Sequence, residues 1–229
     1  MTVAPTEAHS PAVIAPGSDL REAFRAAYDN RYTWEPGFGG YRGRCVHEQD
    51  GRQVVGRFQV GADLKATVED IDDAEIHKAI AGQLWEVAIH RVRRPFEQTH
   101  AENTFNAGDT TEEGVEVIVG GKGAGDRYRI KDDVVTMVHR HIHGTVVTIH
   151  TKSVIATGSG YLSRTYTSQY SDPASGAPRG GLSHFSDTFV PLVEGGPWVL
   201  SERVVETRDP ETDSVQRTVF RFEDLAPLA

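Results

Sequence analysis

The chain is poor in the residue types that would point to several classes of protein. It has one cysteine, Cys45, which excludes an internal disulfide framework and is typical of a reducing compartment. Its net charge of −9 at pH 7 argues against nucleic-acid and anionic-membrane partners, since both require clustered Lys and Arg. No stretch approaches the ~20 apolar residues of a membrane span, and residues 1–18 lack the parts of a signal peptide. We therefore expect a cytoplasmic protein with no nucleic-acid or membrane partner.

The N-terminal residues differ in composition from the rest of the chain. Residues 2–17 are rich in Ala and Pro and show no hydrophobic periodicity, which predicts a disordered tail over residues 1–18. The remaining residues, 19–229, are enough for one domain with a sizeable core.

Two segments have the spacing of amphipathic helices. Asp19 and Glu22 have the separation of a capping box at the start of the first, and Asp72 and Glu75 have it at the start of the second. Pro95 is expected to end the second helix. The apolar stripes are Leu20, Ala23, Phe24, Ala27 and Tyr28 in the first helix, and Ile76, Ala79, Ile80, Leu84, Val87 and Ala88 in the second.

Most of the remaining chain has the pattern of β-strands. Asp50-Gly51, a strong hairpin signal, separates strands predicted at 41–49 and 52–60, and a third is predicted at 64–69. After Thr104 the pattern is β to the end. Strands are predicted there at 115–120, 126–131, 133–143, 145–156, 161–170, 181–190, 197–206 and 214–223.

The order of these elements predicts an α+β fold. Short connections favour antiparallel pairing of neighbouring strands. Two helices cannot cover both faces of a sheet of about ten strands, but one concave face can wrap around them. We therefore expect a strongly curved antiparallel sheet, an open half-barrel, wrapped around two helices. The space between the sheet and the helices is the expected pocket.

Three strings of residues resemble a known family. They are FRAAYDNRYTW at 24–34, GQLWEVAIHRVRRPFE at 82–97 and VHRHIHG at 138–144. On these strings the chain resembles the domain-of-unknown-function family 3386. Its order of elements resembles the half-barrel of lipoprotein-localisation carriers (LolA-like). The resemblance implies a fold and names no activity.

Four histidines fall within twelve residues of a segment with β-strand character: His139, His141, His143 and His150. Imidazole is the commonest side-chain ligand of transition metals. Residues on the same face of a strand stand ~6.5–7 Å apart, so His139 and His141 are close enough to share one ion. If His143-Gly144 is a two-residue hairpin loop, His150 joins them on the same face.

This arrangement predicts a site for Zn, Cu or Fe, with one coordination position open and with His143 as a further candidate ligand. Two alternatives stay open. Gly144 can instead form a bulge in one continuous strand, which would break up the three-histidine site. The histidines can also line a pocket without metal, or form a solvent-exposed stripe.

A second candidate group lies near the end of the second predicted helix. Glu86, His90 and Arg94 are spaced i, i+4 and i+8, so that a carboxylate orients an imidazole and a guanidinium holds an anion. We take them as candidate catalytic residues. The structural alternative is an ordinary salt-bridged outer face of the helix.

Two functions from different classes remain. The first is a small-molecule enzyme that acts in the half-barrel pocket with the histidine cluster, with or without a metal. The alternative is a carrier or sequestering protein for an apolar small molecule, a lipid or a pigment. A protein-interaction module ranks third, since only the exposed sheet edges favour it.

Overall fold

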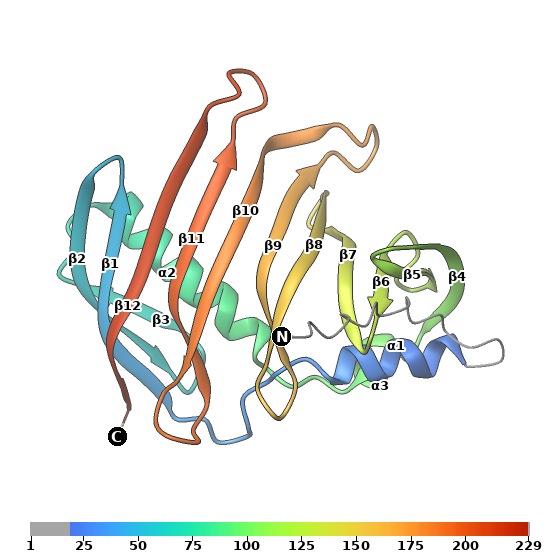
Figure 1. Ribbon diagram of the computed structural model, residues 1–229, viewed down its shortest axis with the longest axis horizontal. Coiled ribbons are helices and arrows are strands. Elements are labelled where there is room, and N and C mark those ends of the chain that lie inside the picture. The colour runs from blue at the N-terminus through green and yellow to red at the C-terminus, as the bar shows by residue number, and fades with distance from the viewer. Residues whose placement is uncertain (1–18, 229) are drawn as a thin grey trace, which may run out of the picture.

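The structure, a computed structural model, describes residues 19–228 and contains there three helices and twelve strands (Figure 1). The predicted disordered tail lies outside the described residues. The helices are α1 (Leu20–Asp29), α2 (Ala74–His90) and α3 (Phe96–His100). The strands are β1 (Gly40–Gln49), β2 (Arg52–Gly61), β3 (Ala66–Glu69), β4 (Asn103–Thr111), β5 (Gly114–Gly121), β6 (Arg127–Lys131), β7 (Val134–Ile142), β8 (Thr145–Ala156), β9 (Tyr161–Ser171), β10 (Pro178–Pro191), β11 (Trp198–Arg208) and β12 (Val215–Pro227).

All twelve strands belong to one open sheet. Its order is β3-β2-β1-β12-β11-β10-β9-β8-β7-β6-β5-β4, and the pairing is antiparallel throughout, as in the pair β1 and β12. The C-terminal strand β12 lies between β1 and β11, so the first hairpin is placed beside the end of the chain. The predicted antiparallel sheet is confirmed, and it is larger than the ten strands expected.

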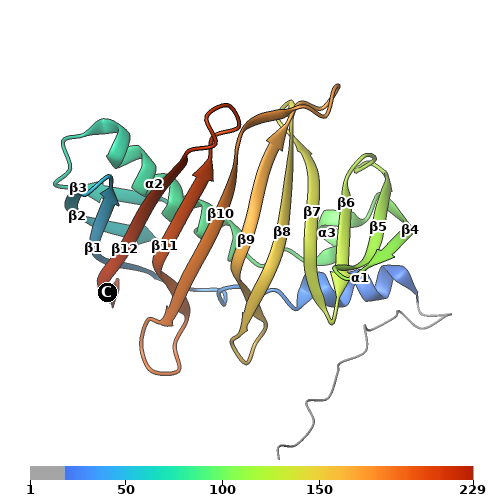
Figure 2. The same cartoon turned by 45° about the horizontal axis from the view of Figure 1, so that its top comes forward.

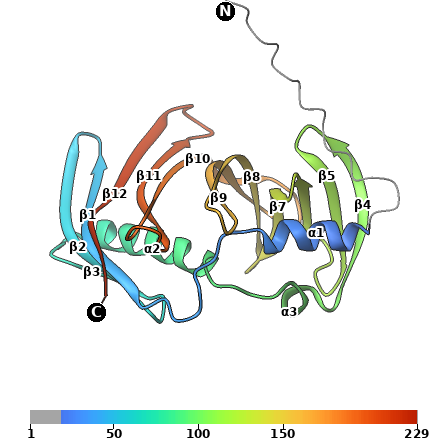
Figure 3. The ribbon, with the colours of Figure 1, turned by 60° about the horizontal axis from the view of Figure 1, so that its bottom comes forward.

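The sheet curves, and the helices lie on its concave side (Figure 3). Helix α2 packs against β1, β2 and β3, whereas α1 packs against β4, β6 and β7. Each helix therefore covers one half of the sheet. Figure 2 shows the strands in the middle of the sheet, β11, β10, β9 and β8, running side by side. None of the three described helices has the length and apolar content needed to cross a membrane.

Two apolar cores follow from this arrangement. The first joins α2 to the strands of its half, with Ile80 and Leu84 fully buried against residues such as Phe58 and Phe222. Cys45 is buried in this core. The second core joins α1 and α3 to β5, β6 and β7 around Phe24, which is also fully buried. The concave surface between the two cores contains polar and charged groups, described below.

The helix starts follow the predicted caps closely. The Asp19 side chain accepts a hydrogen bond from the backbone N–H of Arg21 (2.9 Å). Asp73, rather than Asp72, caps α2 by accepting from Ile76 N–H (3.2 Å). The predicted end of α2 at Pro95 is wrong. The helix ends at His90, because the chain then turns toward the segment after α1 and the Arg91 carbonyl accepts from Trp34 N–H (2.8 Å).

Two elements were not expected from the sequence, α3 and β4. Helix α3 has five residues, too few to show a helical period. Strand β4, with the sequence NTFNAGDTT, has no fully buried residue. It lies at the edge of the sheet, where polar residues are usual because they discourage pairing with other chains. Such a strand has no alternation of apolar and polar residues to reveal it.

Candidate functional site

The β7–β8 hairpin has the register expected from the sequence. Ile142 pairs with Thr145, and His143-Gly144 forms the two-residue loop between them. Both loop residues have positive φ, 49° for His143 and 76° for Gly144, as a tight hairpin of this type requires. The alternative with Gly144 as a bulge is excluded.

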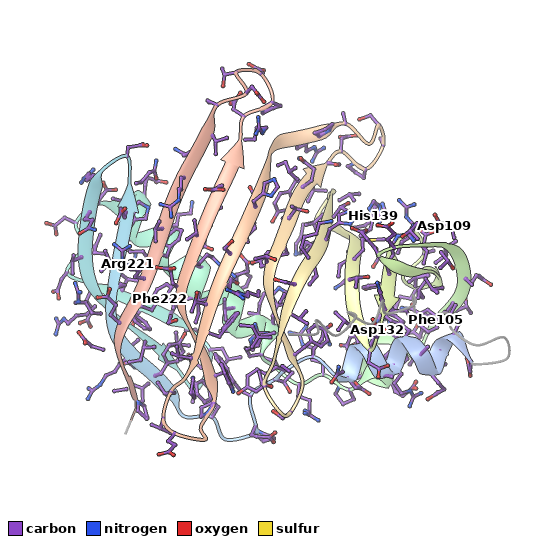
Figure 4. All side chains as sticks on the ribbon, viewed as in Figure 1. Phe105, Asp109, Asp132, His139, Arg221 and Phe222 are labelled. Atoms are coloured by element: carbon purple, nitrogen blue, oxygen red, sulfur yellow. The ribbon has the colours of Figure 1, made fainter. Side chains whose placement is uncertain are left out.

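The histidines of this hairpin lie on the outer face of the sheet. Val138 packs against the core around α1, so alternation directs His139 and His141 to the opposite, convex side. His150 pairs with Met137, the residue before Val138, and shares that convex side. Figure 4 shows His139 at the end of β7 remote from α1. The expectation that these imidazoles converge inside the concavity is wrong.

Each of these histidines has a different polar partner. His139 Nδ1 lies 2.9 Å from Thr148 Oγ1, and His150 Nδ1 lies 2.8 Å from Glu113 Oε2. The rings of His139 and His141 are 5.9 Å apart. Within residues 19–228 no three His, Cys, Asp or Glu side chains are arranged to hold a metal ion. The structure thus brings His139 and His141 together, but neither His150 nor His143 joins them in one metal-binding group.

The prediction of an enzyme working through this cluster in a half-barrel pocket is therefore wrong. Its premise was that the imidazoles of both strands face the helices, and the pleat of the sheet directs them away. Partial burial, followed by the nearby charge of Arg127, lowers the pKa of His139 below its ordinary value. Zn, Cu or Fe ligation by these residues stays a prediction for elemental analysis.

The three candidate residues Glu86, His90 and Arg94 are not joined by any side-chain hydrogen bond or ion pair in the described part of the chain. Arg94 lies beyond the end of the helix, so it does not continue the face of Glu86 and His90. Glu86 Oε1 lies 3.5 Å from Arg203 Nη1, on β11, and forms no ion pair with His90. Part of the His90 side chain reaches solvent, while the rest is surrounded by protein and lies near several cationic groups. Desolvation by its surroundings, and then the charges of Arg91 and three further arginines, lower the pKa of His90 to about 4.

A buried ion pair that sequence reasoning missed joins two middle strands beneath α2. Arg203 donates to both carboxylate oxygens of Asp187, through Nε (2.7 Å) and Nη2 (2.6 Å). It also donates to Tyr166 Oη (2.8 Å) and to Gln83 Oε1 of α2 (2.9 Å). Burial raises the pKa of Tyr166 well above its ordinary value, so this hydroxyl stays protonated. In the sequence, this pair could have been suspected only because each of the two strands has a charged residue, Asp187 or Arg203, at a position that faces the core.

Four arginines without an ion pair lie in the two segments that follow α1 and α2. They are Arg31, Arg91, Arg93 and Arg94, and no carboxylate of the described residues lies within 4.0 Å of any of them. The two segments are neighbours, since Trp34 N–H donates to the Arg91 carbonyl and Arg93 Nε donates to Thr33 Oγ1 (3.2 Å). Two other arginines of the described residues also lack such a partner, Arg42 on β1 and Arg164 on β9.

Two of these arginines are held by neutral groups. Arg31 Nε donates to the Tyr28 carbonyl (2.7 Å), and its guanidinium lies 3.6 Å from the centre of the Tyr28 ring. Arg91 lies 5.4 Å from the centre of the Phe189 ring, and its buried Nε has no hydrogen-bond partner in the described part of the chain. Burial lowers the pKa of Arg91 to about 10, which leaves it charged at neutral pH.

Next to these segments lies an open recess of about 660 Å³. The segment after α1, the β8–β9 turn and the β10–β11 turn form its walls; both turns lie at the lower edge of the sheet in Figures 1 and 2. It differs from the expected pocket, which was placed between the sheet and the helices. Its lining residues are Tyr32, Thr33, Glu35, Pro36, Gly37, Phe38, Thr157, Ser159, Pro191, Gly195, Gly196, Pro197 and Trp198.

Hydrogen bonds hold the aromatic wall of the recess in place. Trp34 Nε1 donates to the Trp198 carbonyl (2.9 Å), and Trp198 N–H donates to Tyr32 Oη (2.8 Å). The Trp34 and Phe38 rings stack with centres 4.1 Å apart. Tyr32 N–H donates in turn to the Tyr161 carbonyl at the start of β9 (2.8 Å). The wall is therefore formed before any ligand arrives.

Comparisons with known proteins agree with the resemblance seen in the sequence. The family model described as "Protein of unknown function (DUF3386)" matches residues 15–228. No curated protein matches the chain.

Among solved structures, a DUF1329 family protein from Desulfovibrio piger is 7% identical with a TM-score of 0.25; the match covers 91% of this chain and 92% of that one. The MucA/MucB complex of Pseudomonas aeruginosa is 11% identical with a TM-score of 0.22, covering 93% and 100%. A second structure of MucB, in complex with MucA(peri), is 10% identical with a TM-score of 0.20, covering 92% and 97%. Likenesses this low do not extend to a shared function.

Proposed function

The chain belongs to the DUF3386 family, and we propose that it is a carrier or sequestering protein that binds a small apolar molecule, such as a lipid or a pigment, in the recess at the lower edge of the sheet. The observation that carries the proposal is the preformed aromatic recess. Its volume of about 660 Å³ lies within the roughly 300–1,000 Å³ usual for small-molecule sites.

The lining has the composition of a site for an apolar ligand. Three aromatic rings and three prolines offer apolar surface, while Thr33, Thr157 and Ser159 supply a few hydroxyls and Glu35 supplies one carboxylate. Aromatic surface contributes most of the binding energy in such sites, and a few polar groups set the orientation of the ligand. The open mouth allows a ligand to enter and leave without a large rearrangement.

The recess also lies where binding sites are common. It is formed by turns and a connecting segment at one end of a long sheet, and loops on a rigid scaffold are common positions for binding residues. The aromatic wall is fixed by hydrogen bonds, so little ordering accompanies binding. A preformed site loses less free energy to ordering than a flexible one.

Native mass spectrometry of the gently purified protein, followed by solvent extraction of any bound molecule, tests the proposal. A second measurement is the quenching or enhancement of tryptophan fluorescence during titration with decan-1-ol. Trp198 lines the recess and should respond.

A matched pair of variants locates the binding. Ser159→Trp places a bulky ring in the β8–β9 turn that lines the recess and should abolish binding. Ser214→Trp makes the same change at another exposed serine, in the β11–β12 turn at the opposite end of the sheet, and should leave binding unchanged (Figure 1). Absence of both a co-purified molecule and decanol binding would refute the proposal.

A further inference from the structure

The segments after α1 and α2 carry more positive charge than their surroundings neutralise. Most arginines of the described residues form ion pairs with carboxylates, as expected in a chain with 33 acidic and 24 basic residues. Arg31, Arg91, Arg93 and Arg94 do not, although acidic side chains outnumber basic ones. A cationic cluster left unpaired in an acidic protein calls for an explanation.

The ends of the helices explain only part of this cluster. Helices α1 and α2 both end beside it, and each helix C-terminus carries about half a negative charge, which favours nearby cations. Asp29, at the end of α1, and Glu35, in the recess wall, add two carboxylates. The four guanidinium charges exceed this sum, and neither carboxylate forms an ion pair with them.

One of these arginines contacts the recess directly. Arg93 Nε donates to Thr33 Oγ1 (3.2 Å), and Thr33 is a lining residue. No other hydrogen bond of Arg93 is formed within residues 19–228, so its terminal nitrogens are free to donate. Arg93 and Arg94 are both exposed. The guanidinium fork suits a carboxylate or a phosphate, which accept two parallel hydrogen bonds.

The interior arginines reinforce the charge at this rim. The buried Nε of Arg91 has no partner within the described residues, and Arg31 is held against Tyr28 by a neutral carbonyl and a ring face. A charge that is not cancelled by a nearby carboxylate acts over several ångströms, more strongly where protein displaces water. Neither arginine forms an ion pair with a carboxylate of the described residues, so both add positive charge to the segments that border the recess.

We propose that the ligand of the recess carries an anionic group, a carboxylate or a phosphate ester, which Arg93 holds at the rim while the aromatic wall holds its apolar body; the exposed Arg94, next in the chain, adds positive charge beside it. This inference rests on the binding function proposed above. It narrows the ligand from any apolar molecule to an acidic amphiphile.

Paired probes of equal chain length separate the two proposals. Decanoate and decyl phosphate carry the anion, and decan-1-ol does not. We expect the acids to bind at least about tenfold more tightly than the alcohol, since a charge-assisted hydrogen bond exceeds a neutral one. Raising NaCl from 0.05 to 0.5 M should weaken binding of the acids and leave the alcohol unaffected.

The double variant Arg93→Gln/Arg94→Gln should lower affinity for the acids at least about fivefold and leave the alcohol unchanged. Lys78→Gln is the control at a distant site. It removes one exposed charge without an ion pair within the described residues, where the double variant removes two, and it lies fifteen positions before Arg93, near the other end of α2. Thermal unfolding of both variants confirms that they fold.

The outcomes are distinguishable. Equal binding of acid and alcohol, both abolished by Ser159→Trp, would leave the binding function standing and overturn the inference. Binding of neither probe would overturn both. Acid binding that Ser159→Trp does not affect would show an anion site separate from the recess, which also contradicts the inference of one amphiphilic ligand.

Discussion

Arg203 and Asp187 form a two-pronged ion pair between β11 and β10 in which each side chain is only 2% exposed. Removing water from two charges costs several kcal/mol per ion, so such a pair is favourable only when its geometry and further hydrogen bonds are good. Here Tyr166 and Gln83 accept two further hydrogen bonds from the guanidinium. The pair links the middle of the sheet to α2.

Breaking this pair from one side should be strongly destabilising. Arg203→Met leaves the Asp187 carboxylate buried without its partner, and we expect a loss of about 3–5 kcal/mol in the free energy of unfolding. The double variant Arg203→Met/Asp187→Leu should lose less than the sum of the single variants, because no charge is left uncompensated. Urea unfolding of the four proteins gives the double-mutant cycle.

The exposed pair of Arg57 and Asp70 is the control, with side chains 67% and 56% exposed. We expect Arg57→Met to change stability by less than about 1 kcal/mol. A loss at Arg203 as small as this would contradict the structural role assigned to the buried pair.

A glycine in the β8–β9 turn allows the segment after α1 to approach. Gly160 has a φ of 141°, and a Cβ there would lie 2.5 Å from the Asn30 carbonyl oxygen. Gly158, two residues earlier, also has a positive φ (85°) but has nothing within 4 Å. Gly160→Ala should therefore cost about 2 kcal/mol more than Gly158→Ala, since both positions have a positive φ and only Gly160 adds a clash with backbone. Chemical denaturation of both variants measures the difference.

Stability should fall in mild acid because of one buried histidine. His100 is 3% exposed among aromatic rings. Desolvation, followed by the charge of Arg140, lowers the pKa of His100 to about 4, below its ordinary value of 6.5. The unfolded chain then binds the proton more readily. The contribution of His100 is complete above pH 6.5 and is lost as pH falls toward 4.

We expect His100→Phe to reduce the loss of stability between pH 7.5 and pH 5 by about 2 kcal/mol relative to the wild type. The readout is this pH dependence and not the absolute stability, because the variant also removes the hydrogen bond between His100 Nδ1 and Asn103. His143→Asn, at the exposed β7–β8 loop, is the control and should keep the wild-type profile. If the stability of His100→Phe and of the wild type falls in parallel as the pH is lowered, His100 does not cause the loss of stability in acid.

Removal of the convex-face histidines should not affect ligand binding. His139 and His141 lie on the side of the sheet away from the helices, and neither lines the recess. The double variant His139→Ala/His141→Ala should bind decanoate within about twofold of the wild type. Elemental analysis of both proteins tests the metal prediction in the same experiment. If the wild type carries a stoichiometric transition metal and the variant does not, the prediction of a metal site at these histidines would be supported.

Local features were predictable where a short-range rule determines them. Asp50-Gly51 predicted the β1–β2 hairpin, whose strands begin and end within one residue of the expectation. His143-Gly144 predicted the β7–β8 register, because only a two-residue loop of positive φ is compatible with that pairing. Asp19 predicted the start of α1 through its cap. Each of these depends on residues close together in the chain.

Features that depend on distant contacts were missed or misplaced. Alternation along β7 shows that His139 and Val138 face opposite sides, but it does not tell which side is concave. That choice depends on α1 packing against Val138 and Tyr128. The recess similarly joins three turns that are far apart in sequence, and the pairing of Arg203 with Asp187 spans two strands.

The amino-acid sequence by itself determined the family, the antiparallel hairpins and the cap of α1, because turn chemistry, alternation and hydrogen bonding to nearby N–H groups act over a few residues. Only the tertiary structure decided which face of the sheet the helices cover, where the recess forms and which arginines are left without carboxylates. Those outcomes depend on the packing of two separate cores, in which each residue's neighbours come from remote parts of the chain.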